Sequence, residues 1–86
     1  MPTICTFFGI LIQMYFNDHE PPHFHAIYAG DKYIVGISPI GIRKGQPSPR
    51  VRSMLLEWTA IHQTDLLANW ERVRADIDPV PVEPLE

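Results

Sequence analysis

The sequence HFHAIYAGDKYIVGIS, residues 23–38, contains two short runs of β-branched and aromatic residues with small and turn-forming residues at 29–31 between them. Successive side chains of a strand point to opposite faces, so Tyr33, Val35 and Ile37 share one face of the second run. Residues such as Gly and Asp favour tight turns. The stretch therefore predicts a β-hairpin with strands at 23–28 and 32–38.

The flanking segments predict further strands. Thr3–Phe8 and Ile10–Phe16 are apolar runs separated only by Gly9, as in a hairpin. Asn17–Pro22 (NDHEPP) is a cluster of turn formers that links this pair to the next. Gly41–Lys44 adds a short edge strand. We expect an antiparallel sheet of four to five strands.

Helical periodicity begins after residue 47. Ser48 followed by Pro49 is a typical helix start, because the hydroxyl accepts an unpaired N–H and proline lacks a donor that would have no partner there. Beyond this point apolar residues recur at helical spacing and form one stripe: Val51, Met54, Leu55, Trp58 and Ile61.

A second apolar stripe lies about a quarter-turn around the helix from the first: Leu66, Trp70, Val73 and Ile77. This change of phase predicts a break near residues 62–65, with Thr64 capping a second helix that ends about Ala75. Both tryptophans should anchor the core. The predicted fold class is α+β, a small antiparallel sheet followed by two C-terminal helices packed on one face.

Residues 76–86, DIDPVPVEPLE, carry three prolines and four acids and cannot be helical. They lack an apolar stripe, so we expect an extended or disordered acidic tail after a single domain at residues 1–75. Truncation after Ala75 should then change the melting temperature little.

Composition and charge exclude several classes of protein. With 86 residues and one cysteine, Cys5, the chain has room for one core, and it has neither a disulfide framework nor a multi-cysteine zinc site. Cys5 should be buried. The apolar N-terminal stretch has no Lys or Arg before Lys32 and is interrupted by Gln13. We therefore expect neither a secretory signal nor a membrane span, and we expect a cytoplasmic location.

Five of the seven basic residues lie at 32–52, a segment that holds no acidic residue. This basic strip is either a phosphate-facing surface or a solvated one.

Three of the four histidines lie in the segment DHEPPHFH, residues 18–25. His23 and His25 alternate on a strand, so they share one face with Cα atoms roughly 6.5–7 Å apart, and Asp18 and His19 can approach from the loop. This pattern leaves three interpretations open: general acid–base chemistry, a divalent metal site, or histidines that only stabilise the turn. The fourth histidine, His62, is expected on a helix, where it is either a packing residue or, if the sheet brings it beside His23 or His25, a third member of the site.

Several segments resemble the small bacterial proteins grouped as domain of unknown function 4160: MPTI (1–4), the pattern from FGI to MYFNDH (8–19), PPHFHA (21–26), EW (57–58), His62, and LANWER (67–72). The resemblance extends from residue 1 to about 75. It implies a gene pair similar to toxin–antitoxin modules, in which the partner is a small protein of domain of unknown function 2442. It implies no catalytic mechanism.

The leading hypothesis is a toxin-like component of a two-protein module that acts on RNA and needs no cofactor or metal. The alternative is a non-enzymatic binding protein, the antitoxin-like half or a scaffold, and a third hypothesis is a small histidine-ligated metalloprotein. Open sheet edges also favour a homodimer or strand addition by the partner. The predicted catalytic residues are His23, His25 and His62, and the predicted substrate contacts are Asp18, His19, Arg43 and Lys44.

Overall fold

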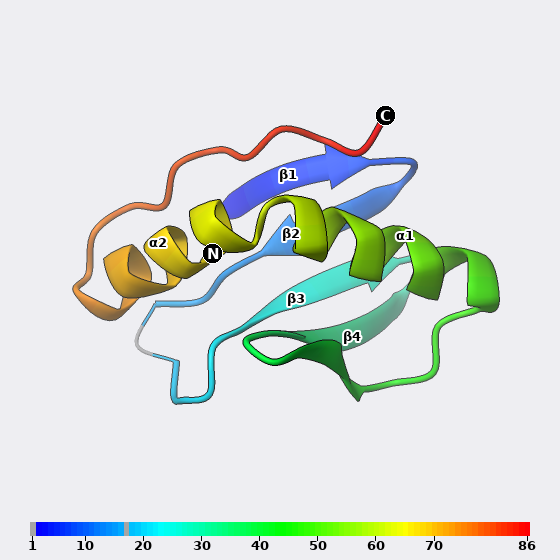
Figure 1. Ribbon diagram of the computed structural model, residues 1–86, viewed down its shortest axis with the longest axis horizontal. Coiled ribbons are helices and arrows are strands. Elements are labelled where there is room, and N and C mark those ends of the chain that lie inside the picture. The colour runs from blue at the N-terminus through cyan, green and yellow to red at the C-terminus, as the bar shows by residue number, and fades with distance from the viewer. Residues whose placement is uncertain (1, 17) are drawn as a thin grey trace.

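The computed structural model describes residues 2–16 and 18–86 and contains a five-stranded antiparallel sheet with the order β1-β2-β3-β4-β5 (Figure 1). Every strand pairs with its neighbour in the chain, so β1 and β5 are the edges. The predicted sheet and α+β class are confirmed. Met1 and Asn17, which belong to the motif MPTI and to the predicted turn, lie outside the described residues. The strands are β1 (Thr3–Phe7), β2 (Ile10–Gln13), β3 (His23–Tyr28), β4 (Asp31–Ile37) and β5 (Ile40–Lys44).

Two tight turns join the predicted hairpins. Phe8 and Gly9 have φ of 47° and 79°, and Ala29 and Gly30 have φ of 49° and 85°. Positive φ at both central residues matches the twist of the flanking strands, and glycine adopts it without steric cost. Strand β1 therefore ends one residue before the predicted Phe8.

The helices are α1 (Pro49–Ile61) and α2 (Gln63–Arg74). The hydroxyl of Ser48 accepts the N–H of Val51 at 3.3 Å, which confirms the predicted helix start. The predicted break is also present, but the cap at Thr64 is wrong, because α2 begins before it. The N–H of His62 still bonds to the carbonyl of Trp58 at 3.0 Å, so the chain leaves helical geometry for one residue only. Within the two described ranges, neither helix is long and apolar enough to cross a membrane.

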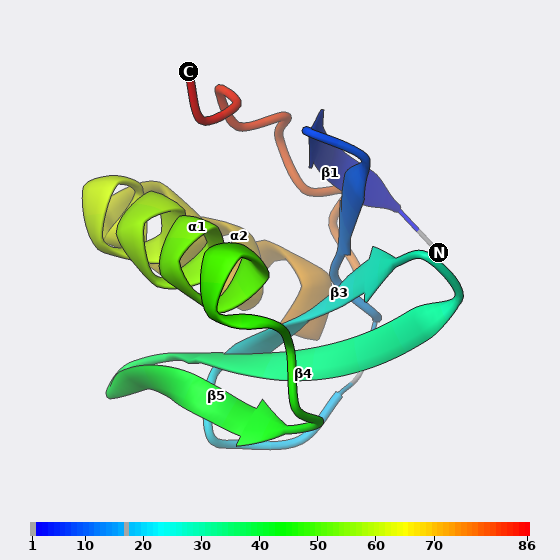
Figure 2. The same ribbon diagram turned by 90° about the vertical axis from the view of Figure 1, so that its right-hand side faces the viewer.

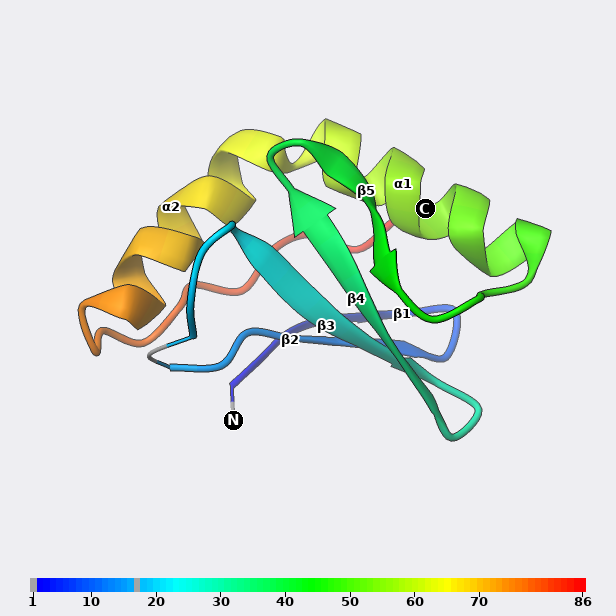
Figure 3. The ribbon, with the colours of Figure 1, turned by 90° about the horizontal axis from the view of Figure 1, so that it is seen from below.

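Both helices cover the same face of the twisted sheet (Figures 2 and 3). The expected face of β4 is buried there, with Tyr33, Val35 and Ile37 all in the core. Ile61, at the end of α1, is 62% exposed and does not join the predicted stripe. The helices contribute six buried apolar residues to the core: Val51, Leu55, Trp58, Leu66, Trp70 and Val73. The tail after α2 adds Val82.

The tail is extended, as expected, but the expectation that it has nothing to bury is wrong. It runs beside the free edge of β1 (Figure 1), where the N–H of Val82 bonds to the carbonyl of Ile4 at 2.9 Å. Pairing between β1 and β2 shifts at Ile4, so Ile4 and Cys5 are both buried although they are adjacent. Side chains of the helices hold the tail backbone as well, since Trp58 donates to the carbonyl of Glu83 at 2.8 Å.

Asn69 makes the most complete of these contacts. Its amide donates to the carbonyl of Val80 and its oxygen accepts the N–H of the same residue, both at 2.8 Å. Buried Asn69 and Trp58 thus both have hydrogen-bond partners in the tail, which packs as part of the folded unit.

Candidate functional site

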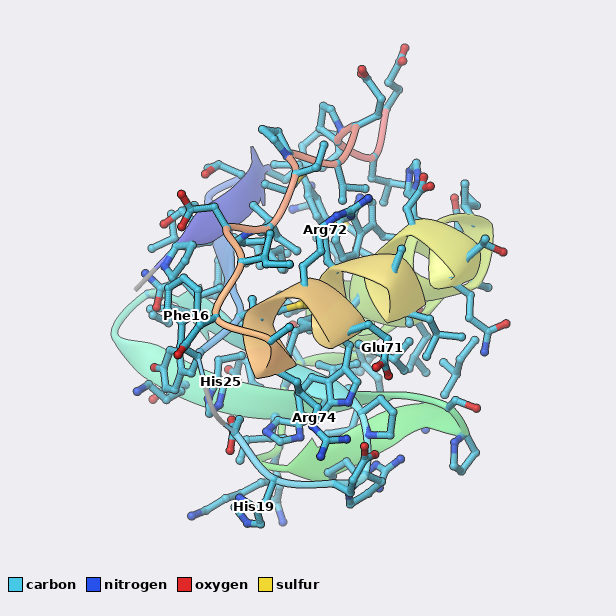
Figure 4. The ribbon with its side chains drawn as sticks, turned by 90° about the vertical axis from the view of Figure 1, so that its left-hand side faces the viewer. Phe16, His19, His25, Glu71, Arg72 and Arg74 are labelled. Atoms are coloured by element: carbon cyan, nitrogen blue, oxygen red, sulfur yellow. The ribbon has the colours of Figure 1, made fainter. Side chains whose placement is uncertain are left out.

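The loop at residues 18–22 and the start of β3 bring three of the predicted histidines together at the end of the sheet beside α2: His19, His23 and His25. Phe24 and Ala26 are fully buried toward the helices, so the alternating His23 and His25 point the other way. The carbonyl of Pro22 accepts the N–H of Ile37 at 3.0 Å, which ties the start of β3 to the end of β4. His25 lies within the molecule and His19 projects from it (Figure 4).

Asp18 is the centre of the cluster. Its Oδ2 lies 2.8 Å from Nε2 of His23 and 3.5 Å from Nε2 of His25. Its Oδ1 accepts the backbone N–H of His19 at 3.0 Å. One ligand atom from each of Asp18, His23 and His25 lies within 4.8 Å of the others. We call these three residues the Asp18 cluster.

The surroundings favour an ionised carboxylate beside a neutral imidazole. Burial alone would raise the pKa of Asp18, but the N–H of His19 and the imidazoles of His23 and His25 outweigh it, so the pKa lies below its ordinary value. Burial lowers the pKa of His25 and outweighs the opposite effect of Asp18. The environment of His25 therefore favours its neutral form.

The other ring nitrogens have contrasting partners. Nδ1 of His23 lies 2.8 Å from the carbonyl of Pro21, and the ring packs against Trp70 with centroids 5.1 Å apart. The ring of His25 stacks on Tyr15 at 4.0 Å. Nδ1 of His25 is the one buried side-chain nitrogen or oxygen without a hydrogen-bond partner in residues 2–16 and 18–86.

A shallow hollow of about 200 Å³ opens beside His23. Pairing of β4 with β5 shifts so that Ile34 faces Lys44 and Val35 faces Ile42, which leaves Arg43 as an extra residue. Such a bulge redirects a side chain, and here the guanidinium of Arg43 lies over Gly36, the residue paired with His23. The hollow is lined by His19, Glu20, Pro21, His23, Ile34 and Arg43.

The structure brings together five of the seven predicted site residues. Asp18, His23 and His25 form the cluster, and His19 and Arg43 join His23 at the hollow. His19 is exposed, with a side chain 93% accessible. Lys44 is exposed on β5 and does not line the hollow.

His62 lies apart from the cluster. Its ring packs on Trp58 at 5.5 Å, its Nδ1 is 3.9 Å from Asp65, and the hollow beside it is lined by α1 and the tail. No contact joins it to His23 or His25 among the residues that the structure describes. The juxtaposition that its role as a third member required is therefore not observed.

Sequence reasoning missed Tyr15 and Lys32. Gln13 pairs with His25, so Tyr15 follows two residues beyond this pair on the same face. Lys32 donates to the Tyr15 hydroxyl at 2.9 Å, and its Nζ lies over the Tyr15 ring, 5.4 Å from the ring centroid. The alternation of β2 could have identified Tyr15 only after the register with β3 was known.

The Asp18 cluster can support two chemistries. A carboxylate between two imidazoles can hold and transfer protons. The same oxygen and two nitrogens can also ligate a divalent transition metal, with open positions left for a substrate or water.

One protein-family model matches most of this chain. The model of the family described as "Domain of unknown function (DUF4160)" matches residues 9–71, which include the cluster, the hollow and most of both helices. No curated protein and no solved structure is significantly similar to the chain. The match extends over more than half of the sequence and agrees with the resemblance carried by the segment DHEPPHFHA. The chain therefore belongs to the DUF4160 family.

Proposed function

We propose that this protein is the toxin-like component of a bacterial two-protein module, and that the Asp18 cluster acts on a phosphodiester of RNA. The observation that carries the proposal is the position of Arg43, whose guanidinium is brought by a bulge to the hollow beside His23. Arginine recognises phosphate oxygens with paired N–H donors and stabilises the charge that develops during phosphoryl transfer. A reactive cluster and a cation thus share one open surface.

The remaining features are consistent with an RNA substrate in the cytoplasm. His19 is exposed at the rim of the hollow and can donate to a second phosphate. Lys32 donates to the hydroxyl of Tyr15, whose ring stacks on His25, and so adds a positive charge near the cluster. The proposed inhibitor is the cognate protein encoded by an adjacent gene, of the domain of unknown function 2442 type.

Expression of the full chain without its neighbour tests this proposal. We expect growth arrest that co-expression of the neighbour relieves and that His23→Ala abolishes. Arg43→Ala should weaken the arrest, whereas Arg52→Ala, an exposed arginine on α1, should not. Purified protein should cleave total RNA with the same order of variants. Growth unaffected by the soluble full chain would contradict the proposal.

A non-enzymatic binding role is the second candidate, and the tail favours it. Trp58 and Asn69 hold backbone atoms of an extended segment, and main-chain recognition of this kind is how many domains bind peptides. In that case the neighbour's product should bind with full affinity to His23→Ala, and RNA should stay intact.

A further inference from the structure

We infer that the Asp18 cluster binds one divalent transition-metal ion through Oδ2 of Asp18, Nε2 of His23 and Nε2 of His25. This inference deepens the proposed function, since it names the agent by which the cluster would act on a phosphodiester. It departs from the expectation, based on sequence alone, that the site needs no metal.

The hydrogen bonding of His23 is the first argument. A carbonyl oxygen only accepts, so Nδ1 of His23 must donate its proton to Pro21 at 2.8 Å. When the ring is neutral, Nε2 carries a lone pair that points at a carboxylate oxygen 2.8 Å away. Such a contact is stable only with a positive charge between the two atoms, which is either a proton on Nε2 or a metal ion bound by both. A backbone carbonyl that fixes the tautomer of a histidine is also the usual outer partner of a metal ligand.

The spacing of the three ligand atoms is the second argument. Bonds of about 2.0–2.2 Å to one ion place neighbouring ligand atoms roughly 3.0–3.4 Å apart. The distances from Oδ2 of Asp18 are 2.8 and 3.5 Å, and all three ligand atoms lie within 4.8 Å of one another. Two of the three separations therefore lie close to the range that binding of one ion requires.

His25 supplies the third argument. Its Nδ1 is buried without a partner in the described chain, whichever nitrogen carries the proton. An unpaired buried nitrogen destabilises the fold, so a strong interaction at Nε2 would offset the cost of burying the ring. A bond from Nε2 to a metal ion provides it, and stacking on Tyr15 at 4.0 Å holds the ring in the plane that this bond requires.

Three ligands leave positions open on the ion, and the ring of His23 lines the hollow that also contains Arg43. Zinc sites with three protein ligands use the open position for water or substrate. One carboxylate and two imidazoles also suit iron(II) and other first-row ions. Imidazoles bind a metal ion as neutral rings, so the bound set carries the single negative charge of the carboxylate, which suits a dication.

The test uses full-length protein stripped with a chelator and titrated with zinc, with cobalt(II) as a spectroscopic probe. We expect one zinc per chain, a rise in melting temperature on binding, and cobalt absorption bands typical of nitrogen and oxygen ligands. His23→Ala, His25→Ala and Asp18→Asn should each weaken zinc binding more than the roughly 10–100-fold seen for loss of an outer partner. His62→Ala removes an imidazole that lies apart from the cluster and should leave affinity unchanged.

Imidazole nitrogen NMR of the wild-type protein gives a readout that does not depend on variants that fold. Zinc should shift Nε2 of His23 and His25, and Nδ1 of His23 should stay protonated. No zinc or cobalt binding by the wild-type chain, or binding that survives both His23→Ala and His25→Ala, overturns the inference. Arrest and RNA cleavage without metal would leave the proposed function standing on proton transfer, and metal binding without either would leave the metal site standing alone.

Discussion

Replacement of Val82 by alanine should destabilise the whole domain, although Val82 lies in the proline-rich tail. Its side chain is 8% exposed and contacts the core. The change removes two buried methyl groups at about 0.8 kcal/mol each, or about 1.6 kcal/mol in total. For a domain of this size, that loss lowers the melting temperature by about 6–13 °C.

Val80 provides a matched control two residues earlier. It is 50% exposed and also belongs to the tail, and its backbone rather than its side chain makes the contacts with Asn69. Val80→Ala is the same chemical change, and as a surface substitution it should stay within about 0.5 kcal/mol of wild type. Thermal and urea unfolding of both variants, measured by circular dichroism, give the comparison.

Truncation after Ala75 extends the experiment. It removes Val82 together with the tail partners of Ile4, Trp58 and Asn69, so its effect should be at least that of Val82→Ala. Equal and small shifts for Val82→Ala, Val80→Ala and the truncation would refute the reasoning and restore the tail to a dispensable extension.

Three further predictions follow from other parts of the structure. Burial raises the pKa of the Cys5 thiol; a backbone hydrogen bond from Thr6 opposes this increase, and the charge of Glu83 adds to it. Native protein should therefore react slowly with iodoacetamide, and the truncated chain should react faster. Equal rates would contradict this. Ser48→Ala should cost about 1 kcal/mol in urea unfolding, because the N–H of Val51 loses its cap, and an unchanged midpoint would show that the cap does not contribute. Gly36→Ala should weaken growth arrest as Arg43→Ala does while the melting temperature stays near wild type, because the three atoms nearest to a Cβ at Gly36 all belong to the Arg43 guanidinium; unaltered arrest would argue against a role for this position of Arg43.

The local pattern was sufficient to predict the strands and most of the helices. Tyr33, Val35 and Ile37 were expected on one face because alternation is a property of a single strand, and Ser48 was expected to cap because its partner is three residues away. The predicted cap at Thr64 was wrong, because the break is a single residue long and the second helix begins before Thr64.

The site and the tail depend on contacts that are distant in sequence. Histidine spacing predicted that His23 and His25 share a face, but the distance of His62 from them follows from how the helices lie on the sheet. Val82 is buried because the tail lies beside β1, which is at the other end of the sequence. No periodicity within residues 76–86 indicates that β1 is its partner.

The extra residue at Arg43 makes β5 the part of this protein where binding can be changed independently of folding. Because β5 is an edge strand, its register is shared with β4 alone. Deletion of Arg43 would leave Ile34 opposite Lys44 and Val35 opposite Ile42 in regular pairing, with no change to the strands that carry the Asp18 cluster. Insertions, deletions and substitutions at this one position can therefore move or remove the guanidinium while the Asp18 cluster stays in place. Under the proposed function, the β5 bulge is the point at which binding in the hollow can be altered separately from the cluster.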